Sequence, residues 1–187
     1  MNQGKKMAFE ARKFRRVVTG HDENGVATVI RDETANCVLQ RLTRPGVTLT
    51  NFWQHDTSPA PMERHDDPVD GPLVLHPPKN GAVFRVVQFD PEDPEVIANI
   101  DGEKAFAAMG AGANVVKGGR HPYMHRTDSL DYSIVLQGEV WMLMDREEDD
   151  LLLKQGDVVI QQGTNHAWAN RGTEPCIMLF VLNDAVK

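Results

Sequence analysis

GDVVIQQGTNHAWAN at residues 156–170 is the stretch that decides the fold, together with HRTDSLDYSIVLQG at residues 125–138 just upstream. In both stretches a run rich in β-forming residues lies next to a glycine turn, which predicts two β-strands. Each strand carries polar side chains that can bind a metal ion beside its turn. Because the two stretches are close in sequence, we expect them to be neighbours in one barrel of an all-β protein.

The remainder of the chain predicts further short strands, separated by turn residues. Residues 54–80 contain six prolines, which exclude a helix or a central strand and predict an ordered loop. RDETANC (31–37) is expected to be another loop, and residues 95–110 hold the one short helical segment, with Gly102 interrupting it. The additional strands are expected at RRVVTG (15–20), GVATVI (25–30), GVTLTNFW (46–53), GAVFRVVQF (81–89), EVWMLMD (139–145), LLLK (151–154) and CIMLFVL (176–182).

The two deciding stretches resemble the two sequence motifs of the cupin superfamily. Asp131 stands where the first motif has a glutamate, six residues before Gly138, and Gly163, His166 and Asn170 match the end of the second motif. The resemblance covers about the last third of the chain. It is strongest to a bacterial and fungal subgroup, some of whose members are cupin-domain oxidoreductases of polyketide pathways. RRVVTG and NGAVFRVVQF upstream resemble the same subgroup.

This resemblance implies an RmlC-like double-stranded β-helix, or jelly-roll barrel, with a strand-rich N-terminal extension. Residues 1–110 are expected to form that extension and the first barrel strands, including the proline-rich loop 54–80. Residues 111–187 are expected to form the barrel core that carries both motifs. The two parts are expected to make a single structural domain with one barrel per chain.

The family's metal site of three histidines and one glutamate is not present in its ordinary form. Five residues separate His125 from Asp131, one more than the family pattern has, and Tyr123 stands where the motif has another histidine. The resemblance leaves His125, Asp131 and His166 as the implied metal ligands. Two imidazoles and a carboxylate suit Fe(II) best, with Mn, Ni or Zn as alternatives. The alternative interpretation is structural: a loop histidine, a turn-capping carboxylate and a buried, hydrogen-bonded histidine.

Strand alternation also predicts the lining of a substrate pocket. Ser133 shares a strand face with Asp131, and Trp168 and Asn170 share one with His166, because successive side chains point to opposite faces. Arg126 is a fourth candidate, since a guanidinium can hold a substrate carboxylate by paired hydrogen bonds. A surface ion pair with Asp128 is its alternative role. His121 is expected at the rim, and Tyr132 on the outer face.

Bulk composition restricts the partners. The 187 residues carry a net charge of −7, which disfavours nucleic acid and anionic membranes. The chain contains no run of about 18 apolar residues, so the sequence predicts no membrane span. The N-terminal stretch has no apolar segment of a secretory signal, and Cys37 and Cys176 form no disulfide framework, so we expect a cytoplasmic protein.

The leading hypothesis is a homodimeric cupin metalloenzyme, an oxidoreductase or dioxygenase that acts on a small organic molecule. A metal-dependent isomerase, decarboxylase or lyase is the first alternative, with the metal stabilising an enolate. A metal-free barrel that binds a small ligand is the second. No catalytic residue is assigned by the sequence, and neither the substrate nor the reaction follows from it, because one fold hosts many chemistries.

Overall fold

A computed structural model describes residues 9–40, 44–64 and 66–187. Most of the regular secondary structure is antiparallel β-strand, which confirms the expected all-β jelly-roll class. Among the described residues, no helix is long and apolar enough to cross a membrane. The strands of the larger sheet follow the order β3 (Val38–Gln40), β4 (Val47–His55), β5 (Ala82–Phe89), β11 (Cys176–Asp184), β6 (Ser129–Gln137) and β9 (Val158–Gln162). Those of the smaller sheet follow the order β10 (Ala167–Ala169), β7 (Glu139–Leu143) and β8 (Leu151–Lys154).

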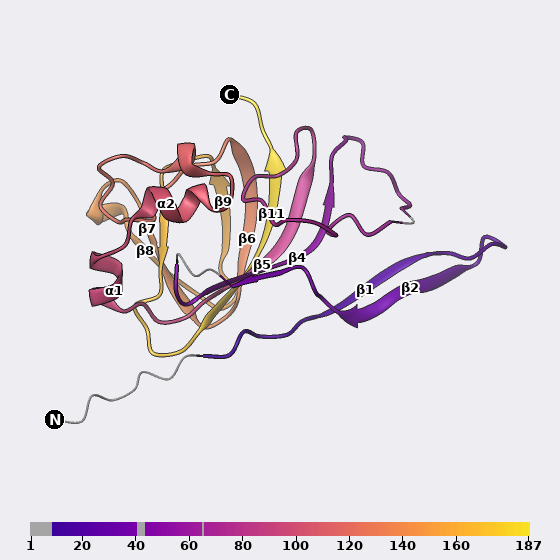
Figure 1. The fold of residues 1–187 in the computed structure, drawn as a ribbon, viewed down its shortest axis with the longest axis horizontal. Helices are drawn as coiled ribbons and strands as arrows, with labels where there is room; N and C mark the ends of the chain where they lie inside the picture. Colours follow the sequence, from indigo (N-terminus) through magenta and orange to yellow (C-terminus); the bar gives the residue numbers. More distant parts are fainter. Residues whose placement is uncertain (1–8, 41–43, 65) are drawn as a thin grey trace.

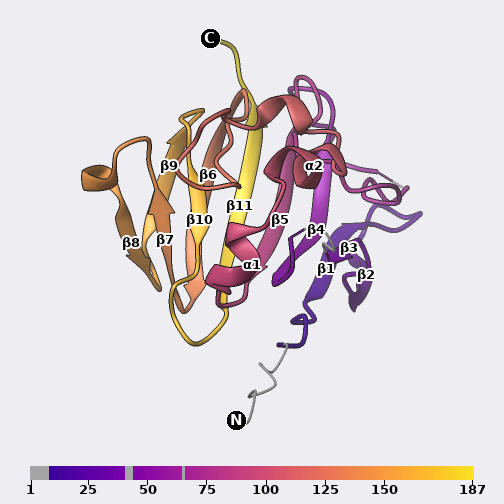
Figure 2. The same ribbon diagram turned by 60° about the vertical axis from the view of Figure 1, so that its left-hand side comes forward.

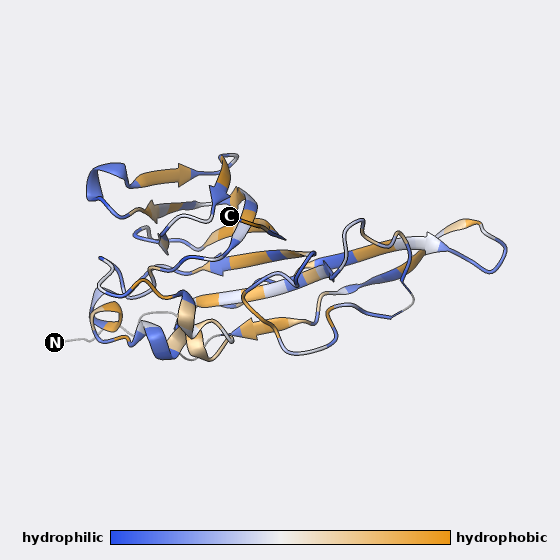
Figure 3. Ribbon diagram, turned by 90° about the horizontal axis from the view of Figure 1, so that it is seen from above, coloured by the Kyte–Doolittle hydropathy of each residue, from blue (hydrophilic) through white to orange (hydrophobic). Residues whose placement is uncertain are grey.

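The two sheets enclose the hydrophobic core. Val87 and Met178 from the larger sheet and Val140, Met142 and Trp168 from the smaller one belong to the same buried cluster. The strands of the two sheets can be followed in Figures 1 and 2, and Figure 3 shows hydrophobic residues along them. Burial of these side chains is the main force that holds the sheets together.

Strands from both halves of the chain build the larger sheet. The central strand β11 pairs with β5 on one side and with β6 on the other. Through this register Phe180 lies between Arg85 and Ser133 on its two neighbouring strands. The polar residues of β6 and β5 therefore lie on one continuous inner face.

The N-terminal hairpin projects away from the barrel (Figure 1). It consists of β1 (Arg15–His21) and β2 (Ala27–Thr34). The prediction that residues 31–37 form a loop is wrong for their first four residues, which continue β2 and pair with β1. Arg16 is buried and forms ion pairs with Glu33 on β2 and Asp67 in the proline-rich loop. This contact ties the hairpin to the loop, which forms no regular helix or strand in its described residues beyond the end of β4.

The segment expected to hold one helical stretch forms two short helices, α1 (Pro94–Ala98) and α2 (Gly102–Ala107). They are separate because Asp93 and Asp101 each cap a helix start with the side chain, which satisfies backbone N–H groups there. Gly102 is required where the backbone passes Pro122, since a Cβ would lie 1.7 Å from the Pro122 carbonyl oxygen. Two further short turns of 3-10 helix lie at Gly112–Asn114 and Glu147–Asp149.

Candidate functional site

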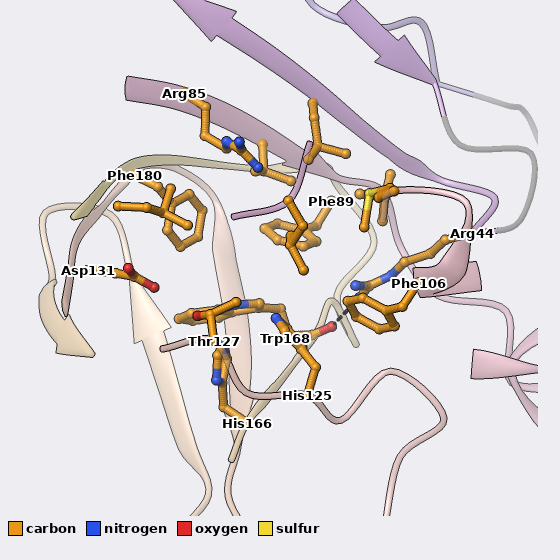
Figure 4. A pocket seen from close by; sticks show the side chains of 16 residues that line it. Arg44, Arg85, Phe89, Phe106, His125, Thr127, Asp131, His166, Trp168 and Phe180 are labelled. Carbon is orange, nitrogen blue, oxygen red and sulfur yellow. Dashed lines mark hydrogen bonds between the residues drawn. The ribbon is translucent and has the colours of Figure 1, made fainter. Parts of the chain in front are cut away.

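A cavity of about 70 Å³ lies inside the barrel. Its walls are mostly apolar and aromatic, and strands of both sheets and the α2 segment contribute to them. An apolar pocket with a few polar groups is the usual form of a small-molecule site. The apolar lining consists of Val47, Leu49, Leu75, Val87, Phe89, Phe106, Met109, Trp168, Phe180 and Leu182, and the polar lining of Arg44, Arg85, His125, Thr127, Asp131 and His166 (Figure 4).

His125 and His166 come together at one side of this cavity (Figure 4). Their backbones form a β-bridge, in which each N–H donates to the other's carbonyl at 2.9 and 3.0 Å. The centres of the two imidazole rings are 4.4 Å apart, and both residues are buried. The bridge therefore places one histidine from each sequence motif beside the other.

Hydrogen bonds at Nδ1 fix the orientation of both rings. Nδ1 of His125 lies 3.0 Å from the Tyr123 carbonyl oxygen. Nδ1 of His166 lies 3.0 Å from the Thr164 carbonyl oxygen and 3.0 Å from Nε2 of Gln161. When Nδ1–H donates to a carbonyl, Nε2 carries the lone pair and can accept a proton or bind a metal ion. If His166 Nδ1 instead accepts from Gln161, its Nε2–H becomes a hydrogen-bond donor.

Burial also sets the charge of His166. The apolar surroundings lower its pKa to about 4, while the hydrogen bond to Thr164 opposes this change. The imidazole is therefore neutral near pH 7, which is the state needed for a proton acceptor or a metal ligand.

Asp131 lines the same cavity from β6 and is only 5% exposed. Burial raises the pKa of its carboxyl to about 6, while a hydrogen bond from Ser129 and the charge of Arg85 act in the opposite direction. Its Oδ1 atom has no hydrogen-bond partner in the described part of the chain. A buried carboxyl with this pKa can exchange a proton near neutral pH.

The predicted three-residue metal site is only partly assembled. His125, Asp131 and His166 all line one cavity, as expected. The paired imidazoles suit a metal ion, because each can direct Nε2 away from its Nδ1 bond. However, within residues 9–40, 44–64 and 66–187 no three His, Cys, Asp or Glu side chains form a group that could hold a metal. In this structure Asp131 lines the cavity without joining such a group, and its role as a third metal ligand stays a prediction.

The predicted pocket residues have different surroundings. Trp168 lines the cavity and packs edge-on against His166. Ser133 is buried on the same face of β6 as Asp131 but is not among the lining residues. Asn170 lies outside the cavity lining, and its amide group donates to the carbonyls of Phe89 and Glu174, both at 2.8 Å. Arg126 is exposed and also lies outside the lining.

His121, expected at the rim, is 9% exposed and does not line the cavity. Its Nε2 lies 3.5 Å from a carboxylate oxygen of Glu92. Tyr132 is 46% exposed, in agreement with its predicted position on the outer face.

Sequence reasoning missed two arginines that line the cavity. Arg44 donates from Nη2 to the Trp168 carbonyl oxygen at 2.7 Å, and its guanidinium lies 4.1 Å from the centre of the Tyr123 ring. Arg85 lies in the middle of β5 and is 2% exposed. For Arg85 the available signal was its position inside the mainly apolar run GAVFRVVQF.

The jelly-roll sheets and the histidine pair define a cupin-type barrel, and sequence comparison agrees. The family model described as "Cupin domain" matches residues 113–182. A cupin-domain-containing oxidoreductase of Hypocrea virens is 30% identical over 184 residues, which cover 92% of this chain and 77% of that protein. The chain belongs to the cupin family.

Two further relatives come from fungal biosynthesis clusters. Oryzines biosynthesis cluster protein J of Aspergillus oryzae is 29% identical over 177 residues, covering 91% of this chain and 82% of that protein. Phomopsin biosynthesis cluster protein D of Diaporthe leptostromiformis is 46% identical over 71 residues. That match spans 37% of each of the two chains, so it concerns only part of the relative. Among solved structures, the polyketide cyclase RemF of Streptomyces resistomycificus is 12% identical with a TM-score of 0.41, over 74% of this chain and 65% of that one.

Proposed function

We propose that this chain is an oxidoreductase that binds a small, largely apolar organic molecule in the barrel cavity. The observation that carries the proposal is the pairing of His125 with His166 beside the cavity that Asp131 also lines. The similarity to a cupin-domain-containing oxidoreductase over 92% of this chain supports the reaction class. The mainly apolar and aromatic lining supports the kind of substrate.

The chain's own residues can supply the proton transfers of such a reaction. Oxidation of an alcohol or a related group removes two electrons, for which dioxygen would be the acceptor, together with two protons. With its pKa raised to about 6, Asp131 is mostly ionised near pH 7 and can accept a proton from a substrate hydroxyl. Asp131 is buried, and the low effective dielectric around it strengthens this interaction.

A divalent metal ion is part of this proposal at the histidine pair. His125 and His166 would hold it through Nε2, with Fe(II) favoured over Mn, Ni or Zn for oxidation. When bound, the metal would supply a Lewis acid and, for Fe(II), a redox-active centre. Asp131 would then act on protons nearby, because it is not grouped with the histidines as a third ligand.

A metal-free ligand-binding barrel is the second candidate. It is favoured by the lack of a group of three metal-binding side chains among the described residues. It is also favoured by the contact of Gln161 with His166, because a bond donated to Nδ1 would leave Nε2–H as a donor to a ligand. In this case the cavity residues would recognise a ligand without transforming it.

Substitution of His166 separates the two candidates. Wild type, His166→Ala and the control His21→Ala, which alters an exposed hairpin histidine, are reconstituted with Fe(II), Mn, Ni or Zn. Metal content is then measured, and turnover is assayed on a panel of small apolar alcohols, aldehydes and acids. For the metalloenzyme we expect bound metal and turnover in wild type and His21→Ala and their loss in His166→Ala. A wild type that binds none of the four metals and turns over none of the panel would contradict the oxidoreductase proposal.

A homodimer is the proposed assembly. The outer face of the larger sheet presents a row of cross-strand neighbours that includes Phe84, Tyr132 and Ile160. These side chains are 39%, 46% and 53% exposed, and apolar surface of this kind commonly marks an interface. Sedimentation equilibrium of wild type against Tyr132→Glu tests it, since a dimer through this face should dissociate in the variant.

A further inference from the structure

Arg85 is the most deeply buried charged side chain that the cavity lining contains. It lies on β5 between Phe84 and Val86, and its inward direction places the guanidinium at the cavity on the side away from His125 and His166 (Figure 4). Only 2% of the residue is exposed. Burial lowers the pKa of Arg85 to about 10, so the side chain still carries its positive charge near neutral pH.

The contacts of Arg85 leave most of its donors unused. Nη2 donates to the carbonyl oxygen of Val74 in the proline-rich loop at 2.8 Å. Nε and Nη1 have no hydrogen-bond partner among the described residues. Buried polar groups in folded proteins are nearly always bonded, and a buried cation depends most on such bonds. The unused donors therefore indicate a site for a group that is not part of the chain.

Neighbours of Arg85 on the inner face also have buried polar atoms without a hydrogen-bond partner among the described residues. Asn51 pairs with Arg85 across β4 and β5, and Ser133 lies beyond Phe180 on β6. Asn51 Oδ1, Ser133 Oγ and Asp131 Oδ1 are all buried without a partner in the part of the chain that the structure covers. Four inner-face residues of the larger sheet thus have buried polar atoms without a partner among the described residues, and two of them, Arg85 and Asp131, line the cavity. This concentration points to a ligand with a polar end directed toward the larger sheet.

We propose that Arg85 is the anchor for an acceptor oxygen, a carboxylate or a carbonyl, on a ligand whose remaining surface is apolar. The inference deepens the proposed function, because it assumes that the barrel cavity is where the substrate binds. The oxygen would accept N–H donors from Arg85, and the apolar body would pack against Phe89 and Trp168, which line the same cavity. The opposite end of the ligand would then face the histidine pair (Figure 4).

The charge balance of the cavity defines what the test must distinguish. Arg85 and Asp131 act on each other electrostatically, so the cation does not stand in an otherwise neutral cavity. A carboxylate would gain from Arg85 and be repelled by Asp131, whereas a neutral carbonyl would be affected by Arg85 alone. Both are recognised by the same guanidinium donors.

The experiment measures binding of benzoate and of acetophenone by calorimetry to protein stripped of metal with a chelator. The variants are Arg85→Met, which keeps much of the side-chain volume, and the control Arg146→Met, which makes the same change at an exposed position. We expect wild type and Arg146→Met to bind one or both probes, and Arg85→Met to bind them on the order of 10- to 100-fold more weakly. Tighter binding of benzoate identifies a carboxylate, and tighter binding of acetophenone identifies a neutral carbonyl.

Arg85→Met should remain folded, because it removes a buried charge that lacks partners for two of its donor nitrogens; its melting temperature is measured alongside. Arg85→Lys, which keeps the charge and reduces the donors, should bind with intermediate affinity and serves if the methionine variant does not fold. In a wild-type crystal soaked with the better probe, an oxygen should lie about 3 Å from a guanidinium nitrogen. Equal affinity of folded Arg85→Met and wild type, or no binding of either probe to wild type, would overturn the proposal. Binding needs neither metal nor turnover, so failure of the oxidoreductase proposal would leave a positive result standing.

Discussion

Replacement of Asp131 by asparagine tests whether a carboxylate is buried at a cost to stability. The substitution keeps the shape of the side chain and removes its ability to ionise. The folded-state pKa is raised from 3.8 to about 6, mainly by burial, so the native state holds the proton more tightly than the unfolded chain. The contribution of Asp131 to the free energy of unfolding is therefore fully present below about pH 4 and is lost as the pH rises through about 6.

The size of the effect follows from the two pKa values. The difference between 3.8 and about 6 corresponds to roughly 3 kcal/mol, at about 1.4 kcal/mol for each pH unit. The asparagine variant would not experience this loss, because its amide does not titrate. The free energy of unfolding of Asp131→Asn, relative to wild type, should thus increase by roughly 3 kcal/mol between about pH 4 and about pH 8.

Urea unfolding of both proteins at several pH values, in the presence of a chelator, measures this difference directly. The pH-dependent part is the useful quantity, because a change in packing at residue 131 shifts the variant by a similar amount at every pH. Parallel stability curves from about pH 4 to about pH 8 would refute the reasoning, since Asp131 would then titrate as in the unfolded chain. A difference that decreases toward high pH would show that a cation stabilises the carboxylate in the native state.

Two other substitutions test the turns that hold the site. Asn170→Ala removes two hydrogen bonds that the side-chain amide donates to the carbonyls of Phe89 and Glu174. The free energy of unfolding, measured in urea, should fall by about 2–4 kcal/mol. An unchanged urea midpoint would mean that other hydrogen bonds replace these two. Gly163→Val should cost roughly 1–3 kcal/mol, because Gly163 has a φ of 57° and an added Cβ would lie 3.1 Å from the Thr127 carbonyl oxygen. Gly163→Asn, which tolerates this conformation better, should cost less in the same thermal unfolding assay, and equal losses would contradict the backbone explanation.

Strand alternation was sufficient to predict the inner face of β6. Asp131, Ser133 and Val135 are buried and Tyr132 is exposed, as the period of two requires. The same rule could not orient β5, because both of its faces are apolar in sequence. Val83, Arg85 and Val87 point inward, and Phe84 points outward with 39% of its surface exposed. Residues of the N-terminal segment cover part of the outer face, where Gln88 accepts from the Arg12 N–H and donates to the Glu10 carbonyl oxygen.

Some residues of the site were predictable from the sequence, but their geometry was not. The two motifs correctly indicated that His125 and His166 would meet, yet both residues of the β-bridge that joins them lie outside the regular strands. The extra residue before Asp131 and its shorter side chain were visible in sequence. Their effect depends on the register of β6 against β9, which places Asp131 opposite Gln161. Register of this kind is set by the whole sheet, so a single strand pattern cannot give it.

Gln161 connects these observations, because it occupies the region where the family motif has a proline. A proline has no side-chain donor, whereas Gln161 bonds Thr164 and contacts Nδ1 of His166 from the strand that pairs with Asp131. The same residue thus contacts His166 and lies opposite Asp131, so it can influence both the tautomer of the imidazole and the position of the carboxylate. If Nδ1 donates to Thr164, His166 can bind a metal ion; if Nδ1 accepts from Gln161, His166 can only donate to a ligand. The choice between an enzyme with a metal and a barrel without one therefore depends on a hydrogen bond made by a residue that the family pattern does not contain.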